Sequence, residues 1–114
     1  MDLELKPTTG LATGLVIHFA EGTWNTLGAG VAMSEEAFDL VEPLLKVAWP
    51  EWSYGMRYGV SEIPGPARRT LLSELLETSR DEGRPEIERR LFAGLAAWLS
   101  TRLHDDQAVT ILGI

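Results

Sequence analysis

The chain has 114 residues, of which 45% are hydrophobic and 24% charged, values that are ordinary for one globular domain and argue against wholesale disorder. It contains no cysteine, which excludes disulfides, thiolate metal sites and cysteine nucleophiles. The formal net charge is −7: residues 1–56 carry eight acids and two bases, whereas residues 57–114 carry nine acids and eight arginines. Such acidity repels phosphate backbones, so we expect a basic protein partner and no nucleic acid.

The N-terminal residues do not resemble a targeting signal. Residues 1–7 alternate apolar and charged side chains and lack the basic start and apolar run of a signal peptide. No apolar stretch reaches the roughly 18–20 residues that a membrane span needs. We therefore expect a cytoplasmic protein that does not enter a membrane.

The first predicted elements are an arm and a β-hairpin. Residues 1–10 end in a Pro-Thr-Thr-Gly sequence, which indicates a flexible arm followed by a turn. Residues 14–20 and 27–33 are short apolar runs with β-branched side chains or glycines, separated by residues that favour turns. This pattern predicts two strands joined as a hairpin.

A helix is predicted to follow the hairpin. Ser34 is a good N-cap, and Glu35 and Glu36 would occupy the first turn, where the helix dipole favours acids. Apolar residues then recur at helical spacing as far as Ala48. Pro43 predicts either a kink or a new start within this helix, because its ring clashes with the preceding turn.

The second half of the chain predicts a strand, two helices and a final strand. Apolar and aromatic side chains alternate with period two over residues 54–60, which favours a strand. Amphipathic helices are predicted from Pro66 until Asp81 and over residues 85–103, and β-branched residues 109–114 predict a terminal strand that could also pair across a homodimer. The order of elements predicts one α+β domain over residues 1–114, with a small, mostly antiparallel sheet and about three helices packed on one face.

No catalytic, metal-binding or cofactor-binding motif is recognisable. His104 with Asp106 could hold a metal, but a histidine at a helix C-terminus is the better interpretation of His104. His18 lies in an apolar run and is interpreted as a packed side chain, not a catalytic base. Residues 27–30 precede a helix but lack the lysine and spacing of a phosphate-binding loop. We therefore expect no metal and no cofactor, and favour a protein that is not an enzyme.

The most unusual segment is aromatic. Residues 49–58 hold four of the nine aromatic side chains of the chain. Tyr54 and Tyr58 are interpreted as core residues of the predicted strand, whereas for Trp52 burial and partial exposure both remain open. Aromatic rings beside an arginine are also typical of binding hot spots.

Two functions are considered. The first is a partner-binding protein whose carboxylates steer a basic protein and whose aromatic residues anchor it. Its general profile is similar to that of bacterial immunity proteins that neutralise a toxin, although no shared motif supports the analogy. The residues predicted to bind the partner are Glu35, Glu36, Asp39, Glu42, Glu51 and Trp52.

The second function is a small-molecule binder or small enzyme. Its pocket would lie between the sheet and the helices and would use polar groups from the middle of the chain. The residues predicted for this pocket are Glu51, Arg57, Tyr58 and Glu62.

Overall fold

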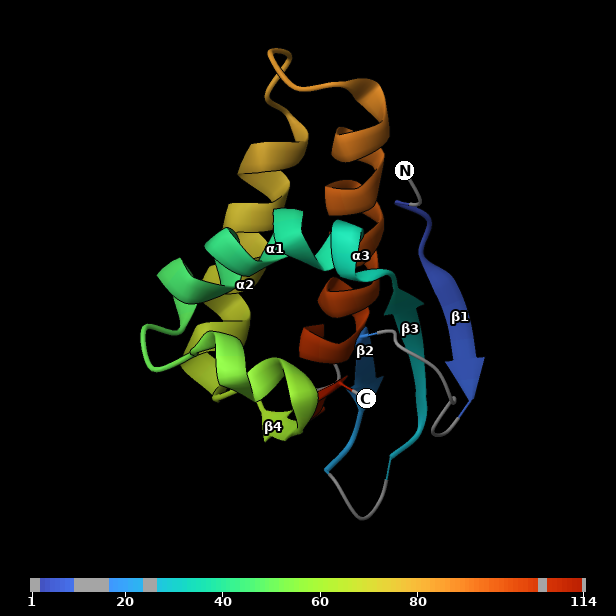
Figure 1. Cartoon of the computed structure of the whole chain (residues 1–114), viewed down its shortest axis with the longest axis vertical. Helices are drawn as coiled ribbons and strands as arrows, with labels where there is room; N and C mark the ends of the chain where they lie inside the picture. Colours follow the sequence, from blue (N-terminus) through green and yellow to red (C-terminus); the bar gives the residue numbers. More distant parts are fainter. Residues whose placement is uncertain (1–2, 10–16, 24–26, 105–106, 114) are drawn as a thin grey trace.

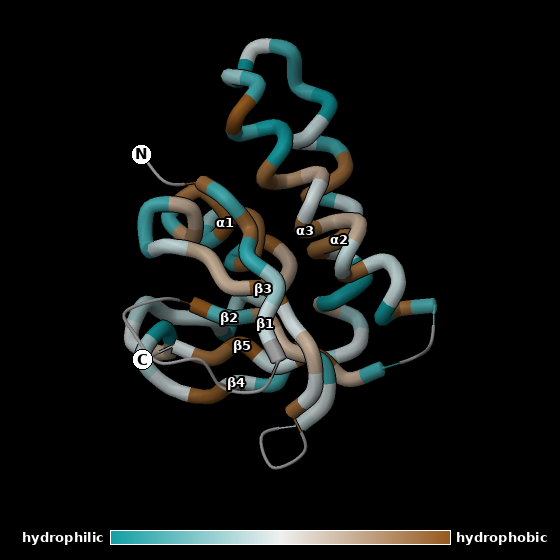
Figure 2. The backbone as a smooth tube through the Cα atoms, turned by 90° about the vertical axis from the view of Figure 1, so that its right-hand side faces the viewer, coloured by the Kyte–Doolittle hydropathy of each residue, from teal (hydrophilic) through white to brown (hydrophobic). Residues whose placement is uncertain are grey.

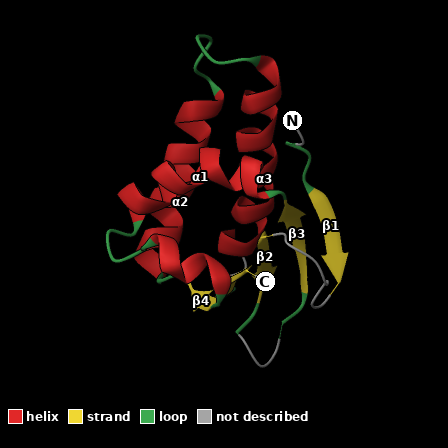
Figure 3. Cartoon of the chain, viewed as in Figure 1, coloured by secondary structure: helices red, strands yellow, loops and turns green. Residues whose placement is uncertain are grey.

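A computed structural model describes residues 3–9, 17–23, 27–104 and 107–113. The strands are β1 (Lys6–Thr9), β2 (Ile17–Glu21), β3 (Ala29–Met33), β4 (Val60–Glu62) and β5 (Val109–Gly113). The helices are α1 (Glu35–Ala48), the 3-10 helix η1 (Tyr54–Tyr58), α2 (Gly65–Ser79) and α3 (Glu86–His104), as Figures 1 and 3 show. The strand order is β1–β3–β2–β5–β4, and every neighbouring pair is antiparallel. The predicted α+β fold is confirmed.

The predicted hairpin is formed by β2 and β3. Their register pairs Ile17 with Met33 and Ala20 with Gly30. A Cβ atom on Gly30 would lie 2.3 Å from the carbonyl oxygen of Phe19, so the two strands need glycine there to approach each other. The glycines of this segment therefore serve strand packing. Residues 14–16 of the predicted first strand lie outside the described residues.

The prediction of a flexible arm is wrong for residues 3–9. Lys6–Thr9 form the edge strand β1, which pairs with β3. Leu3 is only 4% exposed and belongs to the hydrophobic core, and Leu5 packs against that core. Leu3 and Leu5 alternate with charged residues, and this period-two pattern is what brings the segment to the sheet.

Helix α1 begins after the N-cap residue Ser34 and continues through Pro43 without a break. The Ser34 hydroxyl accepts a hydrogen bond from the Ala37 amide at 3.1 Å, as an N-cap does. Pro43 lies inside the helix without ending it. Its exposed position leaves the unpaired carbonyl of the preceding turn accessible to water, and the buried residues on both sides of Pro43 hold the helix to the core.

The strand predicted over residues 54–60 is wrong. Residues Tyr54–Tyr58 form η1, and only Val60–Glu62 form a strand, β4, at the edge of the sheet. The Met56 amide donates to the Ser53 carbonyl at 3.0 Å and closes a tight turn instead of a sheet ladder. Two glycines, Gly55 and Gly59, weaken the strand tendency that the period-two pattern indicated.

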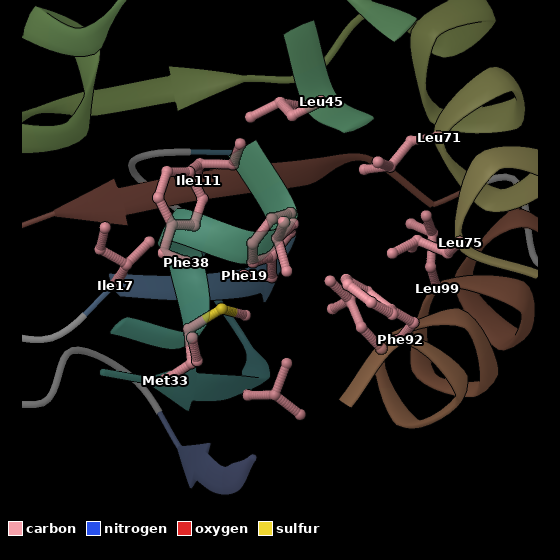
Figure 4. Packing of buried hydrophobic residues seen from close by; sticks show 14 of the residues in the cluster. Ile17, Phe19, Met33, Phe38, Leu45, Leu71, Leu75, Phe92, Leu99 and Ile111 are labelled. Carbon is pink, nitrogen blue, oxygen red and sulfur yellow. The ribbon is translucent and has the colours of Figure 1, made fainter. Parts of the chain in front are cut away.

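The helices cover one face of the sheet. Alternate residues of the central strands, such as Phe19 in β2 and Ile111 in β5, meet Phe38, Leu75 and other helical side chains in one hydrophobic cluster (Figure 4). The intervening strand residues, including His18 at 0% exposure, are buried as well. Both faces of the central strands are therefore buried, although the helices lie on only one.

Helices α2 and α3 pack against each other as a long hairpin. Their connecting loop projects beyond the sheet and carries mostly hydrophilic residues (Figures 1 and 2). Gly65–Ser79 and Glu86–His104 agree with the helices predicted from the sequence. In the described part of the chain, no helix is long and apolar enough to cross a membrane.

Candidate protein-binding surface

Arg57 joins η1 to helix α1. Its Nε donates to Glu42 Oε2 at 3.1 Å, and its Nη2 donates to Glu42 Oε1 at 2.9 Å and to Asp39 Oδ1 at 2.7 Å. The guanidinium carbon lies 5.0 Å from the ring centroid of Phe38 and 4.7 Å from that of Tyr54. The side chain of Arg57 is 3% exposed. Helix α1 and η1 are thus fastened together by a forked ion pair between two aromatic rings.

The charges in this cluster stabilise one another. Burial alone would raise the pKa of Glu42, but hydrogen bonds from Arg57 and Trp52 and the charges of Arg57 and Lys46 outweigh it and lower that pKa. Burial would lower the pKa of Arg57, whereas its hydrogen bonds to Glu42 and Asp39 raise it. Both groups are charged at neutral pH. Glu42 is neutralised inside the molecule instead of being presented to a partner.

Trp52 is a core residue. It is fully buried, and its ring meets that of Phe38 edge-on with centroids 5.9 Å apart. Its indole nitrogen donates to Glu42 Oε2 at 3.0 Å, and its carbonyl accepts a hydrogen bond from Lys46 Nζ at 2.6 Å. Burial is thus the correct alternative for Trp52. Trp52 cannot serve as a surface anchor, which removes it from the residues predicted to bind the partner.

The exposed aromatic residues are Tyr54 and Tyr58. They are 59% and 52% exposed, which overturns their interpretation as core residues. Their rings are T-shaped with centroids 5.8 Å apart, and their hydroxyl oxygens are 2.9 Å apart. This hydrogen bond is the main reason that the pKa of Tyr58 is raised, and the negative charge of Glu35 adds to it. The tyrosine pair is therefore within reach of the negative charge of Glu35, in the first turn of α1.

Acidic side chains at the start of α1 lie on the same side of the molecule as Arg57 and this pair. Glu36 and Asp39 are exposed, Asp39 by 62% of its side chain, and Glu35 is half-buried. Residues three and four apart on a helix are neighbours, so Glu35 and Glu36 flank Asp39 on α1. Glu51 is exposed on the loop between α1 and η1. The acidic tyrosine surface, as we name it, consists of Glu35, Glu36, Asp39, Tyr54 and Tyr58.

The arrangement does not favour the predicted pocket. The Arg57 guanidinium is occupied by Asp39 and Glu42, while Glu51 and Glu62 are exposed. Two cavities lie elsewhere. One, of about 450 Å³, lies between the N-terminal segment and α3, and the other, of about 350 Å³, lies between β1, β3 and α3. Neither is lined by the four residues predicted for the pocket, Glu51, Arg57, Tyr58 and Glu62.

The two histidines lie apart from this surface. His18 is buried in the central strand β2, as interpreted from the sequence, and His104 is the last residue of α3. Among the residues that the structure describes, no group of three or more His, Cys, Asp or Glu side chains could hold a metal ion. Asp106, considered with His104 as a metal ligand, lies outside those residues.

Comparison with known proteins does not place this chain in a family. No protein-family model, no curated protein and no solved structure matches this chain.

Proposed function

We propose that this protein binds a basic protein partner through the acidic tyrosine surface and neutralises that partner in the cytoplasm, as an immunity or inhibitor protein neutralises a toxin. The observation that carries the proposal is the pair of exposed tyrosine rings beside carboxylates on α1. Exposed aromatic rings supply contact area, and carboxylates attract a cationic surface over a distance.

The surface is also well ordered for binding. Arg57 holds η1 against α1, and the tyrosine hydroxyls hold each other, so the two rings lose little freedom when a partner docks. Binding then costs less conformational entropy than it would on a mobile loop. Because the carboxylate of Glu42 is already paired with Arg57, we assign the steering role to Glu35, Glu36, Asp39 and the exposed Glu51.

Affinity capture of the tagged full chain from its native lysate tests this proposal. Partners retained at low salt are identified by mass spectrometry, purified and measured for affinity. Reversing Glu35 and Glu36 to lysine should weaken binding by about tenfold or more, and high salt should do the same, because both changes remove electrostatic attraction. Asp39 is left intact so that the Arg57 ion pair survives.

A matched control variant replaces two acidic residues outside the acidic tyrosine surface with lysine. Glu77, near the end of α2, and Glu82, in the loop that follows, are both exposed. Their reversal changes the net charge by the same amount but leaves the acidic tyrosine surface intact. Equal loss of affinity in both double variants, or a partner that is itself acidic, would contradict the proposal.

A further inference from the structure

Arg57 shows how this chain binds a guanidinium group. The group lies between the rings of Phe38 and Tyr54, at 5.0 and 4.7 Å from their centroids, and its edge donates to two carboxylates. Aromatic faces and carboxylates are the surroundings that suit a planar cation with several donors. The cluster at Arg57 is therefore an internal example of arginine recognition.

The solvent-exposed side of the same cluster also carries an aromatic ring and carboxylates. The ring of Tyr54 contacts the Arg57 guanidinium and also meets the ring of Tyr58 at 71°, and Tyr58 is 52% exposed. The Asp39 carboxylate contacts Arg57 through one oxygen and is itself 62% exposed. The negative charge of Glu35 also reaches Tyr58. An exposed tyrosine and an exposed carboxylate thus remain accessible to a second cation.

The polar groups here are mainly acceptors. The two tyrosine hydroxyls share one hydrogen bond, so one of their two hydrogens is already used. Carboxylates at neutral pH accept hydrogen bonds only. A partner group that fits this surface must therefore bring donors, positive charge and a flat face. Arginine meets all three requirements, whereas the ammonium group of lysine lacks the flat face.

We infer that the acidic tyrosine surface takes an arginine side chain of the basic partner, stacked on Tyr58 with its guanidinium donating to Asp39. This inference rests on the proposed function and specifies which basic residue the surface selects. It adds a preference that net charge alone does not give, because arginine and lysine carry the same charge.

Two capped glycine-containing peptides of equal length and charge, one with arginines and one with lysines, serve as probes. Their affinities for the full chain are measured by NMR titration that follows the ring signals of Tyr58. We expect the arginine peptide to bind about three- to fivefold more tightly than the lysine peptide, because a guanidinium can stack on the ring and donate to a carboxylate at the same time. The Tyr58 ring signals should shift more with arginine than with lysine.

Two variants separate stacking from charge. Tyr58→Leu keeps an apolar side chain at an exposed site but removes the ring, so it should abolish the preference for arginine and weaken arginine binding more than lysine binding. Glu51→Gln is the control, because it removes an exposed charge but no ring and should weaken both peptides equally.

Equal affinity for the two peptides, an unchanged preference in Tyr58→Leu, or no binding of either peptide would overturn the arginine inference. None of these results would overturn the proposed function, which depends on the loss of partner binding when Glu35 and Glu36 are reversed. Conversely, loss of arginine preference in Tyr58→Leu supports the inference even before a partner is identified.

Discussion

A guanidinium that is 3% exposed, such as that of Arg57, is tolerated only where carboxylates and rings replace its water. Changing Arg57 to leucine would leave Glu42 partly buried without its main partner. We expect the free energy of unfolding to fall by about 3 kcal/mol, the cost of breaking such a pair from one side. Urea unfolding followed by tryptophan fluorescence measures this, since Trp52 contacts the same carboxylate.

The control for this prediction is Arg90, whose ion pair with Glu86 is of similar length at 3.0 Å but exposed on both sides. Arg90→Leu should change the free energy of unfolding by no more than about 0.5 kcal/mol. Equal effects of the two substitutions would show that the Arg57 cluster contributes no more than a surface pair.

His18 is the second residue at which burial has a measurable consequence. It is 0% exposed, and within the described residues neither ring nitrogen makes a hydrogen bond of ordinary geometry. Burial lowers the pKa of His18 below its ordinary value of 6.5, and the nearby backbone of Leu112 opposes this only in part. The unfolded chain therefore takes up a proton at His18 more readily than the folded protein does.

This difference predicts a loss of stability in mild acid. The contribution of His18 is fully present above pH 6.5 and is lost as the pH falls from 6.5 towards the lowered pKa of the folded state. Urea unfolding at neutral pH and at about pH 5.5, above the ordinary range of carboxyl groups, measures it. The variant His18→Leu should lose less stability over this interval than the parent chain. An identical loss in both proteins would contradict the prediction.

At the scale of elements, the position of the 3-10 helix η1 depends on a glycine in strand β5. A Cβ atom on Gly113, in β5, would lie 1.3 Å from the carbonyl oxygen of Arg57. Gly113→Ala must therefore displace η1 or β5, and we expect the free energy of unfolding to fall by about 2–3 kcal/mol. The near-ultraviolet circular dichroism of the tyrosine pair should weaken as well.

Gly55, within η1, is the matched control. A Cβ atom at Gly55 would meet nothing within 4 Å, so Gly55→Ala should change the free energy of unfolding by less than about 1 kcal/mol. If Gly113→Ala were as mild as Gly55→Ala, the close approach between β5 and η1 would not constrain the acidic tyrosine surface.

The contrast between α3 and η1 shows what local patterns in the sequence can predict. Helix α3 has a long apolar stripe and a proline just before its first residue, so its sequence alone predicts it. The segment Tyr54–Tyr58 alternates like a strand, yet it forms η1, whose Arg57 is held by carboxylates on α1 and whose backbone is approached by Gly113 of β5, all distant in sequence. Such contacts leave no local pattern.

The same limit applies to the candidate site: its local features could be predicted from the sequence, and its long-range contacts could not. The acidic residues at the start of α1 followed from charge and helix capping, because both are local properties. The exposure of Tyr54 and Tyr58 and the burial of Trp52 were not predictable, since aromatic side chains occur both in cores and at binding surfaces. The contacts that bury Trp52 and hold η1, with Phe38, Glu42 and Asp39 on α1, join residues that are distant in sequence.

At the scale of the whole molecule, the sheet order determines how two copies could pair. Strand β5 lies between β2 and β4, so both of its edges are already used. The homodimer considered from the sequence therefore cannot form through the backbone of this strand. Among the described strands, the outermost positions of the sheet belong to β1 and to the three-residue strand β4.

Pro7 protects the longer of these edges. It lies in β1, and because proline has no amide hydrogen it cannot donate to an added strand. We expect Pro7→Val to restore the donor and raise β propensity, so that the chain self-associates at concentrations at which the parent stays monomeric. Sedimentation velocity over a concentration series measures this. The neighbouring substitution Thr8→Val adds an apolar side chain but keeps Pro7, so it should remain monomeric. Self-association of both variants would show that apolarity, and not the missing donor, controls pairing at this edge.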